Sequence, residues 1–321
     1  MRTKSLALGL AAMLAVAVAT VGGPASAAAA KGPRTLKDYA RPTVTGAQIL
    51  DGVAKFSSDF PLRVTATPTQ VLARGEIARE ATALGYSVTI SSYPGVLEAV
   101  VAVKPGLTKP DERIVFGTHF DVVPQAVQGA YDNGTGTRML MDLARSYAKV
   151  RTHRTLVFAW FNGEEEGALA SDAMAKDYKA RGFKVKAYLG FDMVGIAYPV
   201  RPPLSDKNCL CMWRGAKDEV FDRLLADVNY GFLKFPKGRQ LVSIEGRNVR
   251  NSDEASFADA GFPTLRWAGM RKAADYPQYH LPQDNLETMT TVAGGRPFLE
   301  AGLHNTLLSA YYTAAALDLQ K

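Results

Sequence analysis

Residues 155–171 read TLVFAWFNGEEEGALAS, and they contain a strand signal, a turn signal and a helix signal in a row. The apolar run over 155–161 is short and ends at a turn, which is typical of a buried strand. Asn162 and Gly163 favour a turn, three glutamates follow, and an apolar spacing typical of a helix extends over 168–181. A strand followed by a turn and a helix is the repeating unit of α/β folds, so this stretch predicts that class.

The rest of the chain continues this alternation of strand and helix signals. Strand-like runs lie at residues 87–92, 97–103, 113–118, 187–191, 239–244 and 264–268. Helical patterns lie at residues 46–58, 69–84, 136–150, 218–228 and 297–319. Such alternation predicts a mixed, mostly parallel central sheet with helices on both faces. No internal repeat and no low-complexity linker interrupts the sequence after residue 35, so we expect a single α/β domain over residues 43–321.

The first 27 residues have the order of a secretory signal peptide. Arg2 and Lys4 precede an uncharged run over 6–21, and the small residues of 25–27 follow it. The run is short for a membrane span, and no basic stop-transfer flank follows it. We therefore expect cleavage after this triplet, a secreted (extracellular) protein without a membrane anchor, and a flexible or removable leader over 28–42.

The composition narrows the class of protein further. Of the 321 residues, 47% are hydrophobic and 21% are charged, which excludes disordered, collagen-like and coiled-coil chains. The formal net charge is +7, and it falls to +5 when Arg2 and Lys4 leave with the signal peptide. Because the basic residues form no dense stripe with interleaved aromatics, we expect no nucleic-acid partner. Cys209 and Cys211 are separated by one residue, a spacing that would strain a disulfide, so we expect weak stapling or none, and we do not favour a two-cysteine metal site.

Acidic and histidine side chains stand directly after several of the apolar runs. In open α/β folds the reactive groups gather beyond the carboxyl ends of the strands, so these positions are candidates for chemistry. They comprise His119, Asp121, Asp132, Glu164, Glu165, Glu166, Asp192, Tyr279, His280 and Asp284. The two remaining histidines, His153 and His304, do not fit this pattern, and we interpret them as surface or packing residues.

The first two of these places lie close together in the chain. In RIVFGTHFDVVP, residues 113–124, His119 and Asp121 are two positions apart and therefore lie on the same side of an extended chain. Such a carboxylate could orient the imidazole. Asp132 lies in the Gly-rich turn GAYDNGTGT, which leads into a helix. Each feature alone is also typical of a surface pair or of a helix cap.

The acids that follow the later strands are harder to explain without a cation. Glu164, Glu165 and Glu166 are adjacent, and neighbouring carboxylates at a buried strand end repel each other unless a cation relieves the charge. The helix dipole can account for one or two of them, and we interpret Glu166 as a helix-capping charge. Asp192 ends another apolar run, where an unpaired buried carboxylate would be costly. With two histidines, these acids form the nitrogen and oxygen ligand set suited to zinc.

The order of these residues resembles the secreted bacterial two-zinc (co-catalytic) aminopeptidase family of the leucyl aminopeptidase type, which shares its fold with glutaminyl cyclases. The family pattern is a His with an Asp two residues on, an Asp in a Gly-rich turn, a Glu pair, a strand-end Asp followed by Met, and a final Tyr-His. The matching residues are His119, Asp121, Asp132, Glu164, Glu165, Asp192, Met193, Tyr279 and His280. The segment NSDEASFADAGFP also matches, through Ser252, Asp253 and Phe257, so the resemblance spans most of 45–320.

The resemblance implies a zinc-exopeptidase fold and two zinc ions per chain. It implies that His119 and Asp192 bind one zinc ion and that Glu165 and His280 bind the other. Asp132 would bridge the two ions.

The resemblance also implies the roles of the catalytic residues. Glu164 would be the general base, taking a proton from a water that bridges the zinc ions and passing it to the leaving amine. Tyr279 would donate a hydrogen bond to the oxyanion of the intermediate. Asp121 would orient His119, and the substrate amino terminus would lie near Glu164 and Asp192. The protein would thus be a monomeric metalloprotease of the hydrolase class that acts on the N-termini of peptides or proteins.

The sequence departs from the family pattern at three places. Asn133 stands where many relatives have Asp, Gly190 stands where Asn is common, and Asn251 separates Arg250 from Ser252. These departures concern the substrate pocket and the surroundings of the ligands, so the preferred N-terminal side chain stays open.

The alternatives to an aminopeptidase function are three: a one-zinc glutaminyl cyclase, a carboxypeptidase- or aminoacylase-type di-zinc hydrolase, and a non-catalytic binding relative. The second type inserts a whole domain before its final His, and the 88 residues from Asp192 to His280 leave little room for one. A complete ligand set argues against the other two.

Overall fold

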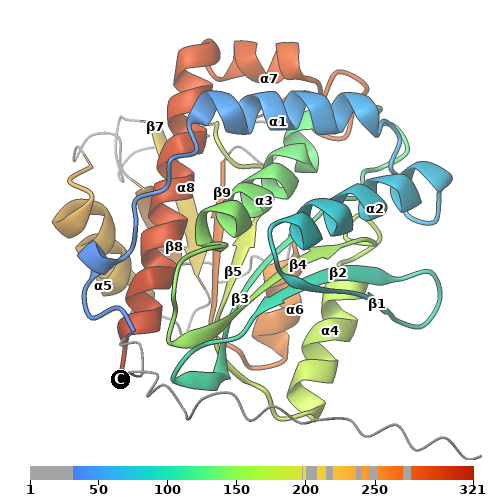
Figure 1. Cartoon of the computed structure of the whole chain (residues 1–321). Helices are drawn as coiled ribbons and strands as arrows, with labels where there is room; N and C mark the ends of the chain where they lie inside the picture. The colour runs from blue at the N-terminus through green and yellow to red at the C-terminus, as the bar shows by residue number, and fades with distance from the viewer. Residues whose placement is uncertain are drawn as a thin grey trace, which may run out of the picture. The chain divides into compact units, whose positions relative to one another are not determined.

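The structure is a computed structural model that describes residues 32–196, 198–199, 208–214, 220–235, 241–245, 252–269 and 276–321. Of these, the three ranges 198–199, 208–214 and 241–245 are described by their backbone only. The predicted signal peptide and the leader up to Lys31 lie outside the described residues. The part from Gly32 to Lys321 forms one compact unit (Figure 1).

Nine strands of the described chain form one mixed sheet. Their order across the sheet is β1 (Ser87–Ser92), β2 (Glu98–Lys104), β4 (Arg154–Phe161), β3 (Lys109–His119), β5 (Lys184–Phe191), β9 (Thr264–Ala268), β7 (Asn208–Arg214) and β6 (Tyr198–Pro199), with β8 (Leu241–Glu245) paired to β7. The central strands β4, β3, β5 and β9 are parallel, whereas β1 and β2 pair antiparallel to their neighbours. Strand β7 pairs antiparallel with β9 and β6 and parallel with β8. The structure thus confirms the expected mixed sheet with a parallel centre.

Helices cover both faces of the sheet, as expected. The larger core lies against α1 (Gly46–Asp59), α2 (Pro68–Ala83), α3 (Thr135–Tyr147) and α8 (Arg296–Leu319). The smaller core lies against α4 (Leu169–Ala180) and α6 (Asp253–Asp259). The remaining helical segments are η1 (Leu36–Asp38), η2 (Ala130–Gly134), α5 (Val220–Ala226), η3 (Asp227–Phe232) and α7 (Leu286–Val292). The crossover helices α3 and α4 connect strands that run parallel: α3 lies between β3 and β4, and α4 lies between β4 and β5.

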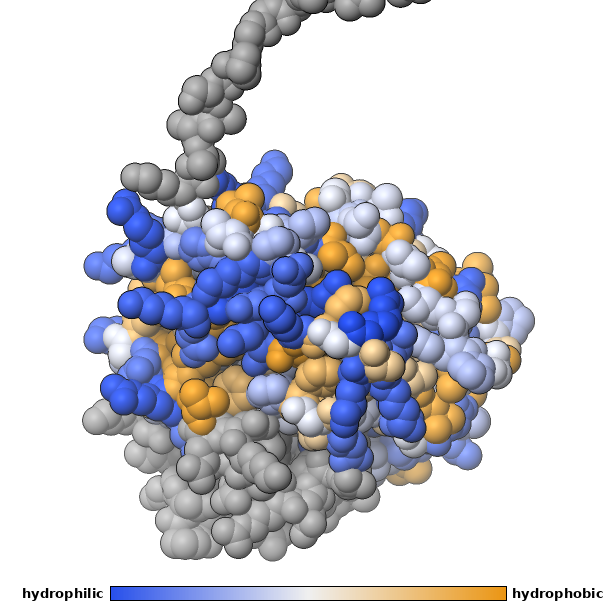
Figure 2. All heavy atoms as spheres, turned by 90° about the horizontal axis from the view of Figure 1, so that it is seen from below, coloured by the Kyte–Doolittle hydropathy of each residue, from blue (hydrophilic) through white to orange (hydrophobic). Residues whose placement is uncertain are grey.

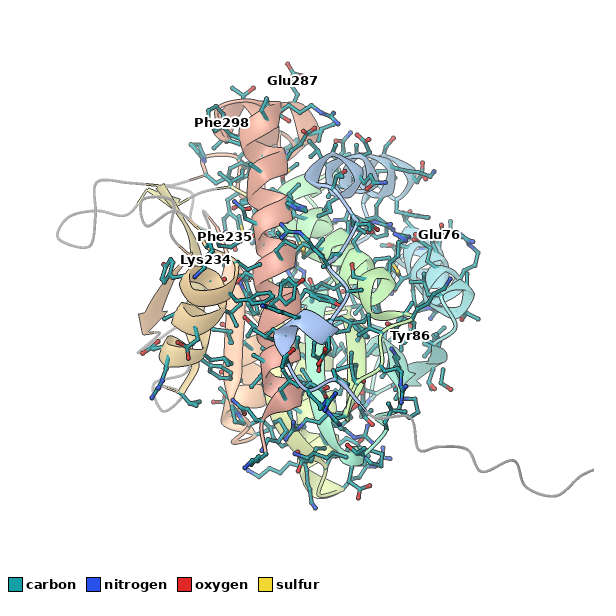
Figure 3. The ribbon with its side chains drawn as sticks, turned by 60° about the vertical axis from the view of Figure 1, so that its left-hand side comes forward. Glu76, Tyr86, Lys234, Phe235, Glu287 and Phe298 are labelled. Atoms are coloured by element: carbon teal, nitrogen blue, oxygen red, sulfur yellow. The ribbon has the colours of Figure 1, made fainter. Side chains whose placement is uncertain are left out.

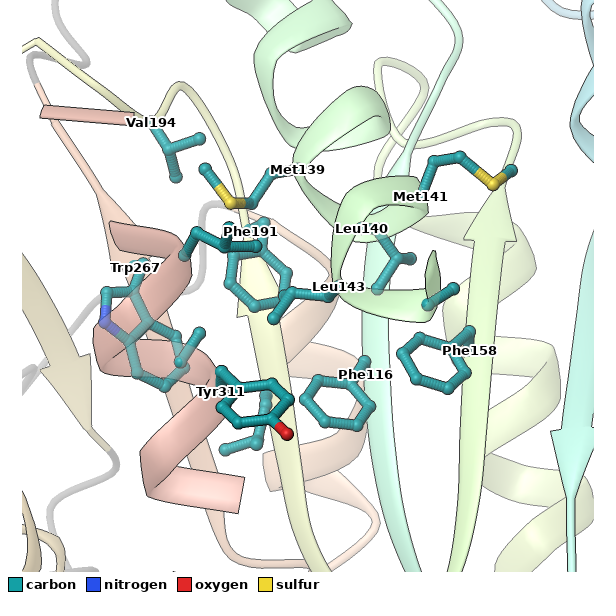
Figure 4. Close-up of a cluster of buried hydrophobic side chains, with 14 of the residues drawn as sticks. Phe116, Met139, Leu140, Met141, Leu143, Phe158, Phe191, Val194, Trp267 and Tyr311 are labelled. Atoms are coloured by element: carbon teal, nitrogen blue, oxygen red, sulfur yellow. The ribbon is translucent and has the colours of Figure 1, made fainter. Parts of the chain in front are cut away.

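The central strands are apolar on both faces because both faces are buried. Phe116 of β3 and Phe158 of β4 face the larger core, where their rings stack at 4.7 Å (Figure 4). Their neighbours Val115 and Val157 face the smaller core. Tyr311 of α8 closes over the larger core, which Figure 4 shows next to Phe116. Burial of this kind stabilises the sheet by about 25 cal/mol per Å² of apolar surface removed from water.

Some elements were not predicted from the sequence. The strands β6 and β7 and the helices α6 and α7 carry no signal long enough to stand out, since α6 and α7 are only seven residues each. Their formation depends on packing against the rest of the fold. Cys209 and Cys211 lie in β7, and their side chains lie outside what the structure describes.

Among the described residues, no helix combines the length and the apolar character needed to cross a bilayer. In the view from below, hydrophobic residues lie scattered among hydrophilic ones (Figure 2). Glu287 of α7 and the exposed Phe298 near the start of α8 both lie at the top of the view in Figure 3.

Candidate metal centre

The parallel strands bring the predicted site residues to one edge of the sheet. His119 is the last residue of β3, and Asp192 directly follows β5. Glu164 and Glu165 lie in the turn after β4. Because β4, β3 and β5 are adjacent and parallel, their carboxyl ends meet at this edge.

His119 lies at the centre of a group of carboxylates. Its Nε2 atom is 3.5 Å from Oδ1 of Asp132, 3.7 Å from Oδ1 of Asp192 and 3.9 Å from Oε2 of Glu164. Its Nδ1 atom is 3.5 Å from Oδ1 of Asp121. The imidazole is buried, so these groups face one another with little water between them.

His280 faces the other side of Asp132. Its Nε2 atom is 3.2 Å from Oδ2 of Asp132 and 3.0 Å from Oε2 of Glu165. The two oxygens of Asp132 therefore face two different imidazoles, and Asp132 lies between them.

All five predicted zinc ligands thus lie in one cluster. Two sets of three donor atoms lie within 4.8 Å of one another: His119 with Glu164 and Asp192, and His119 with Asp132 and Glu165. The first set includes Glu164, for which the family resemblance implies catalysis rather than metal binding. The assignment of each ligand to one ion stays a prediction.

The donor atoms in this cluster fit a metal ion better than they fit one another. Oδ1 of Asp192, Oε1 of Glu165 and Nε2 of His280 are buried and lack a hydrogen bond of suitable geometry. Buried polar atoms are normally hydrogen-bonded, so three unsatisfied atoms at one place call for a ligand. Carboxylate oxygens and imidazole nitrogens are the donors that zinc prefers when thiolates are absent.

Three carboxylates of the cluster, those of Glu164, Glu165 and Asp132, lack sufficient positive charge around them, whereas contacts with His119 and Arg266 lower the pKa of Asp192 against the effect of burial. Burial raises the pKa of Glu164 well above its usual range, and the charge of Asp192 adds to this against the opposing effect of His119. Burial and the charge of Asp132 raise the pKa of Glu165 to about 7. Burial likewise raises the pKa of Asp132. These shifts arise because anions gather where water cannot solvate them, and a bound cation would relieve them.

The two histidines of the cluster have raised pKa values, because carboxylates surround them. Burial opposes protonation of His280, but its contacts with Asp132 and Glu165 raise its pKa to about 10. Burial also opposes protonation of His119, but Glu164 and the other carboxylates raise its pKa well above the usual range. At both histidines the neighbouring carboxylates thus outweigh the effect of burial.

Asp121 does more than face the imidazole. Its carboxylate accepts hydrogen bonds from the backbone N–H groups of Glu164 (3.4 Å) and Glu165 (3.3 Å) and from the hydroxyl of Thr65 (3.2 Å). Asp121 therefore holds the glutamate turn in place beside His119. The proximity to Nδ1 that the family resemblance implies is present, and the contact with the glutamate turn was not predicted.

Asn133 explains one departure from the family pattern. Its side-chain Nδ2 donates to Oγ1 of Thr118 and to the carbonyl of Phe191, and its Oδ1 accepts from the N–H groups of Gly136 and Met193. The side chain is fully buried and joins the ends of β3 and β5 to the start of α3. The contact with the carbonyl of Phe191 requires a donor, which a carboxylate lacks.

Tyr279 lies beside the cluster and opens onto a cavity. Its ring stacks on that of His280 at a centroid distance of 3.7 Å. Burial raises the pKa of the phenol, and nearby carboxylates such as Asp132 add to the shift, so the hydroxyl remains a donor. A cavity of about 400 Å³ is lined by Tyr279 and His280 together with Glu164, Glu165 and Ser252. A second cavity of about 420 Å³ lies between α1, α2 and α3, and no predicted site residue lines it.

Glu166, His153 and His304 fall in different surroundings. The interpretation of Glu166 as a helix cap is wrong, because α4 begins only at Leu169 and Glu166 lies in the preceding turn. The other two histidines lie away from the cluster, as expected. His153 contacts Thr108 and His304 contacts the carbonyl of Val44.

The structure adds buried residues to the site that were not assigned a role from the sequence. Arg266 of β9 lies 3.4 Å from Asp192 and 3.2 Å from Glu254. Arg63 and Asp284 hold the loop that carries Asp132. Only Asp284 had a signal in the sequence, because it shares a loop with His280.

The sequence profile of peptidase family M28 matches residues 99–295, which is more than half of the chain and includes every predicted site residue. The chain belongs to peptidase family M28. The resemblance to two-zinc aminopeptidases is thereby confirmed at the level of the family.

Curated proteins and solved structures are also similar to this chain. Leucine aminopeptidase 1 of Arthroderma gypseum is 28% identical over 253 residues, which cover 73% of this chain and 64% of the fungal protein. The chain therefore spans less than two thirds of that relative's length. The LapA aminopeptidase of Legionella pneumophila matches at a TM-score of 0.68 and 20% identity, over 89% of this chain and 74% of LapA.

A glutaminyl cyclase of Bacteroides thetaiotaomicron has the same fold. It matches at a TM-score of 0.63 and 15% identity, over 88% of this chain and all of the cyclase. At these identities the solved structures show the fold alone, and they confirm the expected single α/β domain.

Proposed function

We propose that this protein is a zinc-dependent aminopeptidase that removes the N-terminal residue from peptides. The observation that carries the proposal is the position of Asp132, whose two oxygens face His119 and His280 at the carboxyl edge of the sheet. Membership of the M28 family and the similarity to leucine aminopeptidases support the choice of reaction.

The residues that would hold the metal are the five predicted ligands. His119 and Asp192 would bind one zinc ion, Glu165 and His280 the second, and Asp132 both. When bound, zinc would act as a Lewis acid that lowers the pKa of water and polarises the substrate carbonyl.

Glu164 is the proposed general base. Its Oε2 atom lies 3.9 Å from Nε2 of His119, and its side chain lines the cavity where a peptide would enter. Burial raises its pKa well above the usual range, which makes the carboxylate a stronger base. Glu164 accepts a proton from the attacking water and gives it to the leaving amine.

Other residues of the chain bind and orient the substrate. Tyr279 lines the same cavity, and its hydroxyl would donate a hydrogen bond to the carbonyl oxygen as negative charge develops on it. Glu164 and Asp192 supply the negative charge that attracts the protonated amino terminus of a peptide. This recognition explains why the enzyme would act at the end of a chain rather than inside it.

We also propose that the protein is secreted, on the strength of the signal-peptide pattern in the first 27 residues. We propose that it acts as a monomer.

The test combines a metal count with substrates that differ only at the amino terminus. We would measure zinc in the purified mature protein and assay leucyl-p-nitroanilide, its N-acetylated form, and a peptide that begins with glutamine. We expect close to two zinc ions per chain and cleavage of the free substrate only. Chelation should abolish cleavage, and zinc should restore it.

Three outcomes would contradict the proposal. One zinc ion per chain with cyclisation of the glutamine peptide would identify a glutaminyl cyclase. Preferential hydrolysis of the acetylated substrate would indicate an aminoacylase-type enzyme. A protein that binds no zinc and cleaves nothing would be a non-catalytic relative.

A further inference from the structure

Asp284 is a buried carboxylate that binds the backbone of the loop carrying Asp132. Its Oδ1 accepts from the N–H of Tyr131 at 2.9 Å, and its Oδ2 accepts from the N–H of Asp132 at 3.0 Å. The hydroxyl of Tyr276 donates to Oδ1 at 3.0 Å. The side chain is fully buried, so water does not compete for these bonds.

The same residue also belongs to the loop that carries His280. The N–H of Asp284 donates to the carbonyl of Leu281, and its own carbonyl accepts from the N–H of Ala130. Asp284 therefore binds two loops at once, one bearing Asp132 and the other bearing His280. No other contact among the described hydrogen bonds joins the backbone of Asp132 to the loop of His280.

A buried cation holds the other side of the Asp132 loop. Arg63 donates to the carbonyls of Phe120, Gln128 and Gly129 at 2.5 to 2.7 Å. Burial lowers the pKa of Arg63 to about 10, and the charge of Asp284 opposes that shift, so the guanidinium remains charged at neutral pH. Arg63 thus holds the carbonyls at the start of the loop, and Asp284 holds the amides at its end.

We propose that Asp284 is a positioning residue that sets the Asp132 carboxylate between His119 and His280 before any ion binds. The effect of Asp284 on zinc binding rests on the proposed function, whereas its hydrogen bonds to the loop of Asp132 do not. A metal site binds tightly when its ligands are already in place, because ordering them then costs nothing at the moment of binding.

A second aspartate provides a matched control at the opposite end of the sheet. Asp318 of α8 is also buried, and it accepts from the adjacent backbone N–H groups of His153 (2.8 Å) and Arg154 (2.6 Å) and from the hydroxyl of Tyr39 (2.5 Å). The chemistry matches that of Asp284: two consecutive amides and one tyrosine hydroxyl. Asp318 binds the start of β4, away from the predicted ligands.

The test compares Asp284→Asn with Asp318→Asn in the full-length mature protein. Each change keeps the shape of the side chain and replaces one acceptor oxygen by an amide that cannot accept. We would first measure backbone hydrogen exchange of the metal-free proteins over residues 129–134, and then zinc affinity by competition with a chelator. Thermal unfolding would show that both variants are folded.

We expect exchange over 129–134 to accelerate in Asp284→Asn, by about tenfold or more, and to stay unchanged in Asp318→Asn. We expect zinc affinity to fall about 10- to 100-fold in Asp284→Asn and to change less than about threefold in Asp318→Asn. Unchanged exchange in Asp284→Asn, or equal losses of zinc affinity in both variants, would overturn the proposal.

The proposed function can fail separately from this inference. If the wild-type protein binds no zinc and cleaves no peptide, the aminopeptidase assignment is wrong, yet the exchange measurement on the metal-free proteins still decides whether Asp284 holds the loop. If the wild-type protein is an active zinc enzyme and Asp284→Asn keeps its zinc affinity, only the inference is wrong.

Discussion

Oδ2 of Asp132 lies 3.2 Å from Nε2 of His280, which joins the loop after β3 to the loop before α7. The other oxygen of the same carboxylate faces His119. A single side chain thereby connects two imidazoles that come from distant parts of the chain. This relationship is the core of the site, and the proposed activity depends on it.

Replacement of Glu164 by glutamine should remove the general base and leave the shape of the cavity. We expect kcat to fall by about 10²- to 10⁴-fold because proton transfer is lost, and KM to rise much less, because only one of the two charges that attract the amino terminus is removed. Steady-state kinetics with leucyl-p-nitroanilide, together with a zinc count, would measure this. A lower zinc count in Glu164→Gln would show instead that Glu164 is a metal ligand, as its proximity to His119 and Asp192 also allows.

Replacement of Tyr279 by phenylalanine should remove a hydroxyl and keep the ring that stacks on His280. We expect kcat to fall by about 10²-fold, because a donor to the developing oxyanion is lost. Zinc affinity should stay at the wild-type level, which a chelator competition would check. Unchanged kcat would exclude Tyr279 from the reaction.

Replacement of Asn133 by aspartate should destabilise the protein whether or not zinc is present. The new carboxylate would face the carbonyl of Phe191 without a donor, in a fully buried position. We expect the free energy of unfolding to fall by about 2 kcal/mol or more. Urea denaturation of the metal-free protein would measure the change, and a loss below about 0.5 kcal/mol would contradict the assignment of these hydrogen bonds.

Replacement of Asp142 by asparagine should change how stability depends on pH. Burial raises the pKa of Asp142 in α3 from 3.8 to about 6, although Arg138 and Arg145 oppose the shift. The folded state then holds this proton more tightly than the unfolded state, so its contribution to stability is complete below about pH 4 and is lost as the pH rises through 6.

The loss amounts to about 2 to 3 kcal/mol, since one pKa unit corresponds to about 1.4 kcal/mol. Urea denaturation of both proteins between pH 4 and 7 would measure it. The Asp142→Asn protein should lack this part of the decline and be relatively more stable at pH 7. An identical pH dependence in the two proteins would contradict the prediction.

Much of the fold was predictable because its signals are local. The runs that became β3, β4 and β5 are apolar on both faces, and turn residues mark their ends. The seven-residue helices α6 and α7 were not predictable, since isolated helices of that length do not form without tertiary packing. Glu166 was misplaced for a similar reason, because the exact first residue of α4 depends on the turn that Asp121 holds.

The sequence by itself determined which acids and histidines follow the strands, and in what order they occur. That order was enough to indicate the family, because parallel strands place their carboxyl ends at one edge regardless of detail. Only the tertiary structure decided which oxygen faces which imidazole and which buried residues hold them there. Those relationships, such as the hold of Asp284 on the amide of Asp132, join segments far apart in the chain. They depend on backbone N–H and C=O groups, which every residue except proline carries, so the sequence does not show which of them will be used.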